Sequence, residues 1–326
     1  MRKERKHATY LKEQEKEIEL KERFRELEHE NKVLKRHVKM PIKDSSSRDP
    51  SFWNSSRHLI HLSQDKHHQI CRTLKFQVTH FSRSDVQTFN MIGSGVFGKV
   101  YKGSIVSMNQ VVVIKTVSHS NFLNVLAECK MGIVMNGHRN FPFIYGIMKP
   151  NMLLFEFVRD DCGSQSPTIK DFFDNKLDKV QTGIIINICI QLCEAIHDLH
   201  IKGILHNDIH PRNVLVKNKQ FVKLIDFGKA TLINDPVRYS IEPNSERYMK
   251  YNRVHLFLAH ELRNVPGSYQ SIATDIYSVG YNIDFIARNV GNSKISAIAT
   301  NMMVEDPNKR PPLSRCITFL ERYKVK

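Results

Sequence analysis

The sequence lacks several features that would mark a secreted or membrane protein. Its six cysteines are scattered and form no CxxC pair, so we expect reduced, buried thiols, as in a reducing compartment. No run of eighteen apolar residues occurs, so no membrane-spanning helix is expected. The charged N-terminus has no apolar stretch typical of a secretory signal. We therefore expect a cytoplasmic or nuclear protein.

Acidic residues are also in short supply. Lys and Arg number 49 against 33 Asp and Glu, which gives a formal net charge of +16. The excess is spread along the chain rather than held in one tail. Such a surface attracts acidic proteins, anionic lipid or nucleic acid without specificity, although it is also typical of a soluble protein with a basic surface.

Glycine is absent from the first 40 residues, and within them a seam recurs every seven residues. The seam contains one Asn among apolar side chains: Leu20, Phe24, Leu27, Asn31, Leu34 and Val38. This pattern predicts a coiled-coil helix over 1–40, forming a homodimer or binding a partner; the alternative is a solvated, fraying helix, because three heptads are marginal. The basic cluster at its start is too short to form a helix that crosses a major groove of DNA, so we expect no sequence-specific nucleic acid binding.

Residues 41–85 are rich in Pro, Ser and His and predict a basic linker with little core of its own. His67 and His68 are adjacent there. No Cys or carboxylate set has ligand spacing beside them, so we expect solvated histidines rather than a metal site.

From Val86 onward the pattern is that of a folded domain. Short β-branched segments come first, around 100–101, 111–114, 144–148 and 152–158, and helical periodicity dominates later, as over 184–199. A strand-rich half followed by a helix-rich half predicts an α+β fold with two lobes and a cleft between them.

Residues 92–100 read Ile-Gly-Ser-Gly-Val-Phe-Gly-Lys-Val and contain the pattern GxGxxG. A dinucleotide-binding fold would need a helix after the last glycine, whereas residues 99–103 read as a strand. We therefore expect the glycines at a hairpin tip, where backbone without side chains can close over phosphates. A plain Gly-rich hairpin is the alternative.

Lys115 ends the apolar strand that follows. Glu128, within a predicted helix at 122–135, is the only acidic residue between Lys115 and Glu156. A buried Lys needs a counter-charge to stay protonated. Glu128 can supply that charge and aim the ammonium at phosphate oxygens.

Asn213 opens one predicted strand and Asp226 closes the next, with a hairpin turn at 217–220 between them. In an antiparallel hairpin these positions face the same end, and a carboxylate with an amide oxygen suits Mg²⁺. Asp208 lies in the preceding loop. It can orient a substrate hydroxyl and accept its proton.

At this point the sequence resembles the eukaryotic protein kinase family. The glycine-rich loop, strand Lys, helix Glu, His-x-Asp loop and Asp-Phe-Gly occur in the family's order. Three later segments resemble the end of the activation segment, the helix that braces the catalytic loop, and the site of an Arg that pairs with Glu261: 259–261, 275–280 and 306–311. The resemblance covers residues 86–326, with an N-lobe at about 86–158 and a C-lobe at about 159–326.

The resemblance implies a protein kinase that uses ATP and Mg²⁺ on a protein substrate. Asp208 would be the catalytic base, supported by Lys115 and Glu128. Asn213 and Asp226 would ligate the metal. The implied ATP-binding residues belong to the glycine-rich loop, the strand Lys and the hinge: Ile92, Gly93, Ser94, Gly95, Val96, Phe97, Gly98, Lys99, Val100, Lys115, Glu156, Phe157 and Val158.

Some positions depart from the family pattern. Asn207 replaces the Arg that normally receives an activation-loop phosphate, so we expect activity without loop phosphorylation. His210 stands where Ser/Thr-directed members usually carry Lys, and Arg212 where many Tyr-directed members carry Arg. We favour Ser or Thr as the acceptor. His260 replaces the usual Pro before Glu261.

Two other functions stay open. One is a pseudokinase scaffold that dimerises through the N-terminal helix, which Asn207 and His260 favour. The presence of all five side chains that transfer needs opposes it: Lys115, Glu128, Asp208, Asn213 and Asp226. A small-molecule kinase of related fold is opposed by the Ala-His-Glu segment and by Arg310.

Overall fold

The computed structural model describes residues 64–326 except 96–97, 118–121, 175–179, 239–254, 266 and 325–326. The predicted coiled coil over 1–40 lies outside the described residues, as does the first part of the predicted linker. The described residues all belong to one of two compact units, which runs from Leu59 to Lys326.

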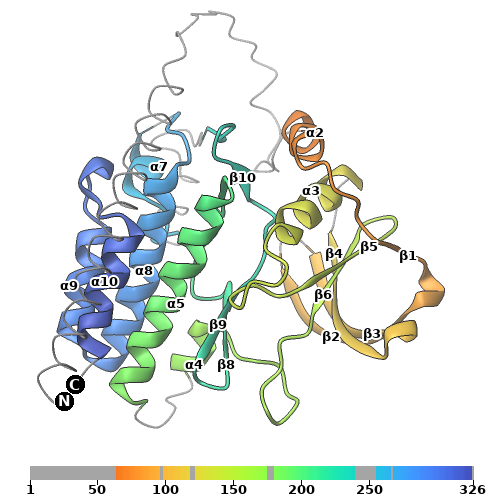
Figure 1. Ribbon diagram of the computed structural model, residues 1–326, viewed down its shortest axis with the longest axis horizontal. Coiled ribbons are helices and arrows are strands. Elements are labelled where there is room, and N and C mark those ends of the chain that lie inside the picture. Colours follow the sequence, from red (N-terminus) through yellow and green to blue (C-terminus); the bar gives the residue numbers. More distant parts are fainter. Residues whose placement is uncertain are drawn as a thin grey trace, which may run out of the picture. The chain divides into compact units, whose positions relative to one another are not determined.

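A six-stranded sheet with the order β1-β5-β6-β4-β3-β2 forms the N-lobe, at the right of Figure 1. Its strands are β1 His80–Phe81, β2 Val86–Gly95, β3 Gly98–Ile105, β4 Gln110–Val117, β5 Ile144–Met148 and β6 Met152–Glu156. All neighbours are antiparallel except β1 and β5. The strands predicted over 111–114 and 144–148 are confirmed, and the one predicted over 152–158 ends at Glu156.

The glycine-rich segment is a hairpin between β2 and β3, as predicted. Gly95 pairs with Gly98, and β3 continues directly from Gly98 without a helix. Gly98 has φ +145, and a Cβ there would lie 1.7 Å from the carbonyl oxygen of Thr116. Only glycine fits at a position so close to the neighbouring strand. Val96 and Phe97 lie outside the described residues.

Helix α3, Phe122–Ile133, packs on the sheet through its apolar face. Val125 and Cys129 form a cluster with residues of β5 and β6: Ile144, Ile147 and Leu153. Burial of this face fixes the rotation of α3 about its axis, because the apolar side chains of a helix recur on one stripe. The predicted helix is confirmed and ends two residues early.

Residues 64–85 correct the predicted linker, because they fold onto the N-lobe. Helix α2, Gln64–Thr73, buries Ile70 against residues of α3 and the segment after it: Ala127, Met131 and Met135. Lys130 of α3 is buried and donates to the carbonyl oxygens of Cys71, at 3.2 Å, and Leu74. A cation at the C-terminal end of a helix is electrostatically favourable.

The sequence of α2 hides this packing, because it has few apolar residues and no continuous stripe. His67 is only 5% exposed, so the expectation of a solvated histidine is wrong there. His68 is exposed as expected. The loop before β2 contains a short 3-10 helix, η2, Arg83–Asp85.

The C-lobe is mostly helical and lies at the left of Figure 1. Its helices are α4 Ile169–Asp174, α5 Thr182–Ile201, α7 His260–Asn264, α8 Ile272–Val290, α9 Ser293–Met302 and α10 Leu313–Lys324. The described C-lobe also has two small antiparallel sheets: β7 Ile204–Leu205 pairs with β10 Thr231–Leu232, and β8 Val214–Lys217 forms a hairpin with β9 Phe221–Leu224. The chain therefore has the predicted two-lobed α+β fold.

Among the described helices, α5 alone is long and apolar enough to cross a membrane by length and composition. Most of it is buried in the C-lobe core, where Ile188, Leu192 and Ile196 are fully covered. The helix that meets this length-and-composition criterion is therefore a helix of the C-lobe core. Burial also raises the pKa of the Cys189 thiol on this helix to about 12.

All six cysteines are free thiols. Cys129, Cys189, Cys193 and Cys316 are buried, as predicted. The prediction is wrong for Cys162, which is exposed in a turn.

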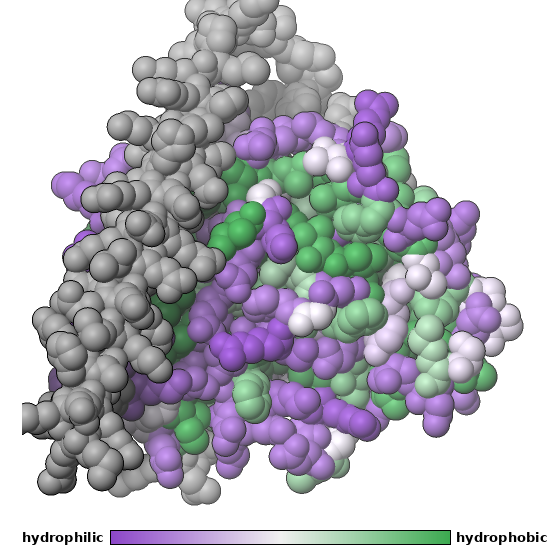
Figure 2. Space-filling view, in the orientation of Figure 1, coloured by the Kyte–Doolittle hydropathy of each residue, from purple (hydrophilic) through white to green (hydrophobic). Residues whose placement is uncertain are grey.

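The surface of this unit is mixed. On the face drawn in Figure 2, hydrophilic residues cover much of the described surface and hydrophobic residues gather in one area beside them. Exposed large apolar side chains occur on β2, at Phe89 and Met91, and on the 3-10 helix η3, Val106–Met108. Single exposed apolar residues are ordinary on folded domains, so none of them marks a docking surface.

The contact between α2 and α3 predicts a large effect of one core substitution. Ile70→Ala should lower the free energy of unfolding by about 2–4 kcal/mol, because it leaves a cavity among packed side chains. The measurement is urea unfolding of the full chain. Gln69→Ala, at an exposed position of the same helix, is the control and should change the value by less than about 0.5 kcal/mol. Equal effects would mean that α2 does not pack on α3.

Candidate active site

Lys115 is the centre of a buried ionic cluster. It lies on β4, and its Nζ is 2.7 Å from Glu128 Oε1 of α3 and 2.7 Å from Asp226 Oδ1, just after β9. Lys115 and Glu128 are each 8% exposed. The sheet, α3 and the segment after β9 therefore meet at one ammonium group.

The pKa values of the three groups follow from this arrangement. Burial opposes the charge of Lys115, but the two carboxylates outweigh it and raise the pKa of the ammonium. For Asp226 burial also opposes ionisation, yet Lys115 and the backbone N–H of Gly228 hold its pKa at about 2. Burial raises the pKa of Glu128, and neighbouring Asp226 adds to that rise. One cation thus stabilises Asp226 more than Glu128.

Asn213 and Asp226 lie at the same end of the β8–β9 hairpin, as predicted. Val214 pairs with Leu224, and the backbone N–H of Ile225 donates to the carbonyl oxygen of Asn213 at 2.9 Å. The turn at the opposite end contains Asn218 and Lys219, both at positive φ. The hairpin register therefore brings an amide and a carboxylate to one edge of this small sheet.

Asp208 is buried beside this edge. The Nδ2 of Asn213 donates to its carbonyl oxygen at 3.0 Å and to its Oδ2 at 3.3 Å. Lys229 lies on the other side, with its Nζ 2.8 Å from Asp208 Oδ1. The Asp208 carboxylate is therefore held in one orientation from two directions.

Hydrogen bonds to Asp275 of α8 hold the loop that carries Asp208. Asp275 accepts hydrogen bonds from the backbone N–H groups of His206, at 2.8 Å, and Asn207, at 2.9 Å. Its Oδ2 also lies 2.9 Å from His200 Nε2. The predicted bracing of this loop by Asp275 is confirmed. A buried carboxylate with this many donors holds the loop firmly.

Asn207 lies in the left-handed region, with φ +65. Its Nδ2 donates to the carbonyl oxygen of Lys229 and to Oγ1 of Thr231, both at 2.9 Å. Asn is one of the few residues other than Gly that tolerate this backbone conformation. The neutral amide of Asn207 therefore ties the Asp208 loop to β10. An Arg at this position has no such amide and could not make these bonds in the same way.

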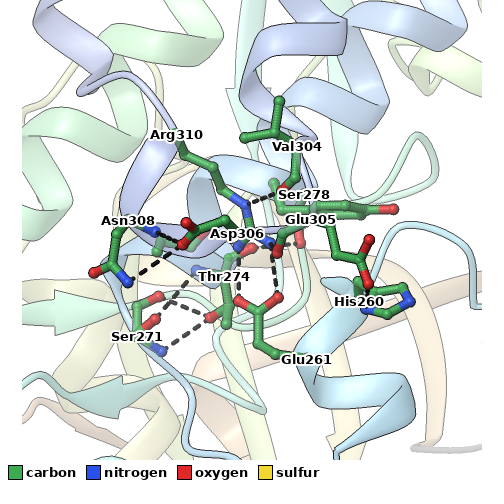
Figure 3. A network of polar contacts seen from close by, with 12 residues as sticks. His260, Glu261, Ser271, Thr274, Ser278, Val304, Glu305, Asp306, Asn308 and Arg310 are labelled. Carbon is green, nitrogen blue, oxygen red and sulfur yellow. Dashed lines mark hydrogen bonds and ion pairs between the residues drawn. The ribbon is translucent and has the colours of Figure 1, made fainter.

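Arg310 and Glu261 form the predicted pair. The guanidinium donates to both carboxylate oxygens at 2.7 Å, and it also donates to the carbonyl oxygens of Ala273 and Val304, as Figure 3 shows for Val304. His260 Nδ1 lies 3.4 Å from Glu305 Oε1 in the same network. The bidentate pair fixes α7 against the segment before α10.

The hinge between the lobes begins where β6 ends. Glu156 Oε2 lies 2.8 Å from Lys223 Nζ of β9 and accepts from the backbone N–H of Phe143 at 3.1 Å. Phe157 and Val158 are buried. The Glu156 side chain thus connects the N-lobe to β9 of the C-lobe.

The described glycine-rich residues lie on β2 and β3. Ile92, Gly93 and Val100 are half-buried, whereas Ser94 and Lys99 are exposed. Gly93 pairs with Val100 across the hairpin. Val100 in turn pairs with Lys115 of β4, so β3 connects the hairpin directly to the ionic cluster.

The donor set fits magnesium and a nucleotide phosphate. Hard oxygen donors come from Asp226 and Asn213, and Lys115 supplies a cation beside them. A Cβ at Gly228 would lie 3.0 Å from Asp226 Oδ1 and 3.6 Å from Glu128 Oε2, so glycine keeps this polar cluster accessible. Within the described part of the chain, no group of three or more His, Cys, Asp or Glu residues is arranged to hold a metal ion.

Two residues of the site were not identified from the sequence. Lys229 contacts Asp208, and Lys223 contacts Glu156. For Lys229 the signal was present, because it directly follows the Asp-Phe-Gly segment. For Lys223 there was none, since an alternating strand residue looks like an ordinary solvent-facing Lys.

Comparison with known proteins agrees with this geometry. The family model described as the protein kinase domain matches residues 86–288. The chain is 30% identical over 200 residues to MAP3K epsilon protein kinase 1 of Arabidopsis thaliana, covering 59% of this chain and 14% of that protein. It is 26% identical over 226 residues to the tyrosine-protein kinase transmembrane receptor Ror of Drosophila melanogaster, covering 64% and 32%.

A third relative is a probable LIM domain-containing serine/threonine-protein kinase of Dictyostelium discoideum. It is 28% identical over 173 residues, 52% of this chain and 26% of that protein. The matched regions thus make up between 14% and 32% of the length of these relatives.

The bonds of the Asn207 side chain predict a measurable contribution to stability. Asn207→Ala should lower the free energy of unfolding by about 1–3 kcal/mol more than Asn109→Ala does, because it leaves buried polar groups without their donor. Asn109 is also left-handed, with φ 49, but it is exposed. Subtracting the loss for Asn109→Ala corrects the Asn207→Ala value for the cost of placing Ala in a left-handed backbone conformation. Equal losses in urea unfolding would show that the Asn207 amide contributes nothing.

Proposed function

Since the chain belongs to the protein kinase family, we propose that it transfers the γ-phosphate of ATP to a hydroxyl group of a protein substrate. The observation that carries the proposal is the convergence of Lys115, Glu128 and Asp226 beside Asp208 and Asn213. These side chains come from distant stretches of the sequence. Structural stability alone does not require three carboxylates at one edge of a cleft.

Lys115 would hold the phosphate oxygens, with Glu128 fixing the position of its ammonium. Asn213 and Asp226 would hold Mg²⁺. The bound metal would neutralise charge on the transferred phosphoryl group. The 2.7 Å ion pair between Lys115 and Asp226 supports this division of roles, because it brings an ammonium and a carboxylate into contact.

Asp208 would orient the acceptor hydroxyl and take its proton. The amide of Asn213 fixes one carboxylate oxygen, and Asp275 fixes the loop. A base positioned in this way contributes about 10²–10⁴-fold to the rate. Orientation of the acceptor and compensation of charge contribute the larger part of the acceleration.

We also propose that the activation segment need not be phosphorylated. Asn207 offers no cation to a phosphate, and its amide is already bonded to Lys229 and Thr231. The neutral amide does locally what a phosphate-bound Arg would do: it ties the catalytic loop to the start of the activation segment.

The acceptor is proposed to be Ser or Thr. The Arabidopsis and Dictyostelium relatives are named as MAP3K and serine/threonine kinases, and the Drosophila relative as a tyrosine kinase. Homodimerisation or partner binding through the predicted helix over 1–40, and residence in the cytoplasm or nucleus, rest on the sequence alone.

A pseudokinase scaffold, which would bind nucleotide and partners without transfer, is the second candidate. Two departures from the family pattern, Asn207 and His260, favour it. The two candidates differ in one outcome, the incorporation of phosphate.

Asp208→Asn tests the proposed function. Phosphatase-treated wild type should incorporate radiolabelled phosphate from ATP, and the variant should lose at least about 100-fold in kcat while still binding nucleotide, because only the base is lost. Asp161→Asn, the same change at an exposed position, should match the wild type. Wild-type protein that binds nucleotide but incorporates no phosphate would contradict transfer and support the scaffold.

A further inference from the structure

Asp208 has a second, unexpected cation beside it. Lys229 Nζ lies 2.8 Å from Asp208 Oδ1, and both side chains are largely buried, at 16% and 7% exposure. His210 Nε2 lies 3.8 Å from the same oxygen, which is beyond hydrogen-bond distance. Lys229 is therefore the cation in direct contact with the carboxylate of the proposed base.

Lys115 and Lys229 contact different carboxylates. Lys115 is bonded to Glu128 and Asp226, so its charge is shared between two carboxylates. Lys229 contacts Asp208 instead. Without Lys229, the Asp208 carboxylate would place an uncompensated negative charge next to the phosphoryl group that it must approach, and like charges at such distances repel strongly inside a protein.

The backbone of Lys229 is held as firmly as its side chain. Its carbonyl oxygen accepts a hydrogen bond from Asn207 Nδ2 at 2.9 Å. It follows Gly228, whose N–H donates to Asp226 Oδ1 at 3.0 Å. One short segment thus sets the positions of Asp226 and of the Lys229 ammonium. An ammonium has three donors, so it can bind Asp208 and a phosphate oxygen at the same time.

We propose that Lys229 is a positioning residue for phosphoryl transfer: it orients Asp208 and compensates charge between this carboxylate and the phosphoryl group. Lys229, in the segment after Asp-Phe-Gly, supplies a cation to Asp208. His210 of the catalytic loop is beyond hydrogen-bond distance of this carboxylate. This inference rests on the proposed function and adds a residue to its site. Asn207 acts through Lys229 by fixing its backbone.

Lys229→Met tests the proposal by kinetics. It should lower kcat by about 10- to 100-fold, as loss of a charge-stabilising group does, and raise KM for ATP by about tenfold, because its contact with the γ-phosphoryl group already exists in the bound substrate. Lys229→Arg should retain most of the activity, because it keeps the charge. Lys202→Met, at an exposed position after α5, is the matched control and should behave like the wild type.

A relocated lysine gives a sharper test. His210→Lys added to Lys229→Met should recover at least about tenfold of the lost kcat, because position 210 lies near the same Asp208 oxygen, 3.8 Å from His210 Nε2, and a longer Lys can bring an ammonium to it. A merely structural role for Lys229 would not be rescued in this way. Failure of both Lys229→Arg and the double variant to retain activity would overturn the proposal.

Binding without turnover is an independent readout. With Mg²⁺ present, Lys229→Met should weaken binding of a non-hydrolysable ATP analogue by about tenfold and leave ADP affinity unchanged, because only the analogue carries a γ-phosphoryl group. Isothermal calorimetry measures both affinities. Equal losses for the two nucleotides, or a lowered midpoint of thermal unfolding without nucleotide, would assign Lys229 a structural role and overturn the proposal.

These outcomes separate the inference from the proposed function. If the wild type transfers no phosphate but Lys229→Met loses its preference for the analogue, the function fails and the placement of Lys229 stands. If the wild type is active and Lys229→Met matches it in kcat and in both affinities, the function stands and the inference fails.

Discussion

One buried ammonium, that of Lys115, holds together the elements on which the site depends. A cation removed from water must be compensated by nearby negative charge, because an unpaired buried charge is very costly. Lys115 satisfies this need with Glu128 of α3 and Asp226 after β9, each at 2.7 Å. The requirement couples three elements that are far apart in the sequence. Displacing α3 or the Asp226 segment would leave part of this charge without a partner.

The surrounding structure keeps those elements in place. The apolar face of α3 packs on β5 and β6, and α2 packs on α3 through Ile70, with Lys130 binding the C-terminal carbonyl oxygens of α2. In the C-lobe, Asp275 holds the loop that carries Asp208. Lys223 bridges β9 to Glu156 at the hinge. Apolar packing thus positions the helices and sheet, and short polar contacts position the reacting groups.

The resemblance to the kinase family implied the Arg310–Glu261 pair, whereas local patterns in the sequence were enough to predict the two-lobed fold, the glycine-rich hairpin and the β8–β9 hairpin. Strand alternation and turn residues encode these features within short stretches. Helix α2 was missed because a single Ile among polar residues gives no amphipathic stripe. The contacts of Lys229 and Asn207 were missed because they join loops, whose paths are set by tertiary packing and not by any periodic pattern.

A double-mutant cycle tests whether Glu128 acts through Lys115. Calorimetry would measure the affinity of Mg²⁺ and a non-hydrolysable ATP analogue for the wild type, Lys115→Met, Glu128→Gln and the double variant. If Glu128 works by fixing the Lys115 ammonium, Glu128→Gln weakens binding in the wild type but changes it by less than about twofold once Lys115 is Met, since coupled residues are not additive. Losses that multiply independently in the double variant would contradict the account.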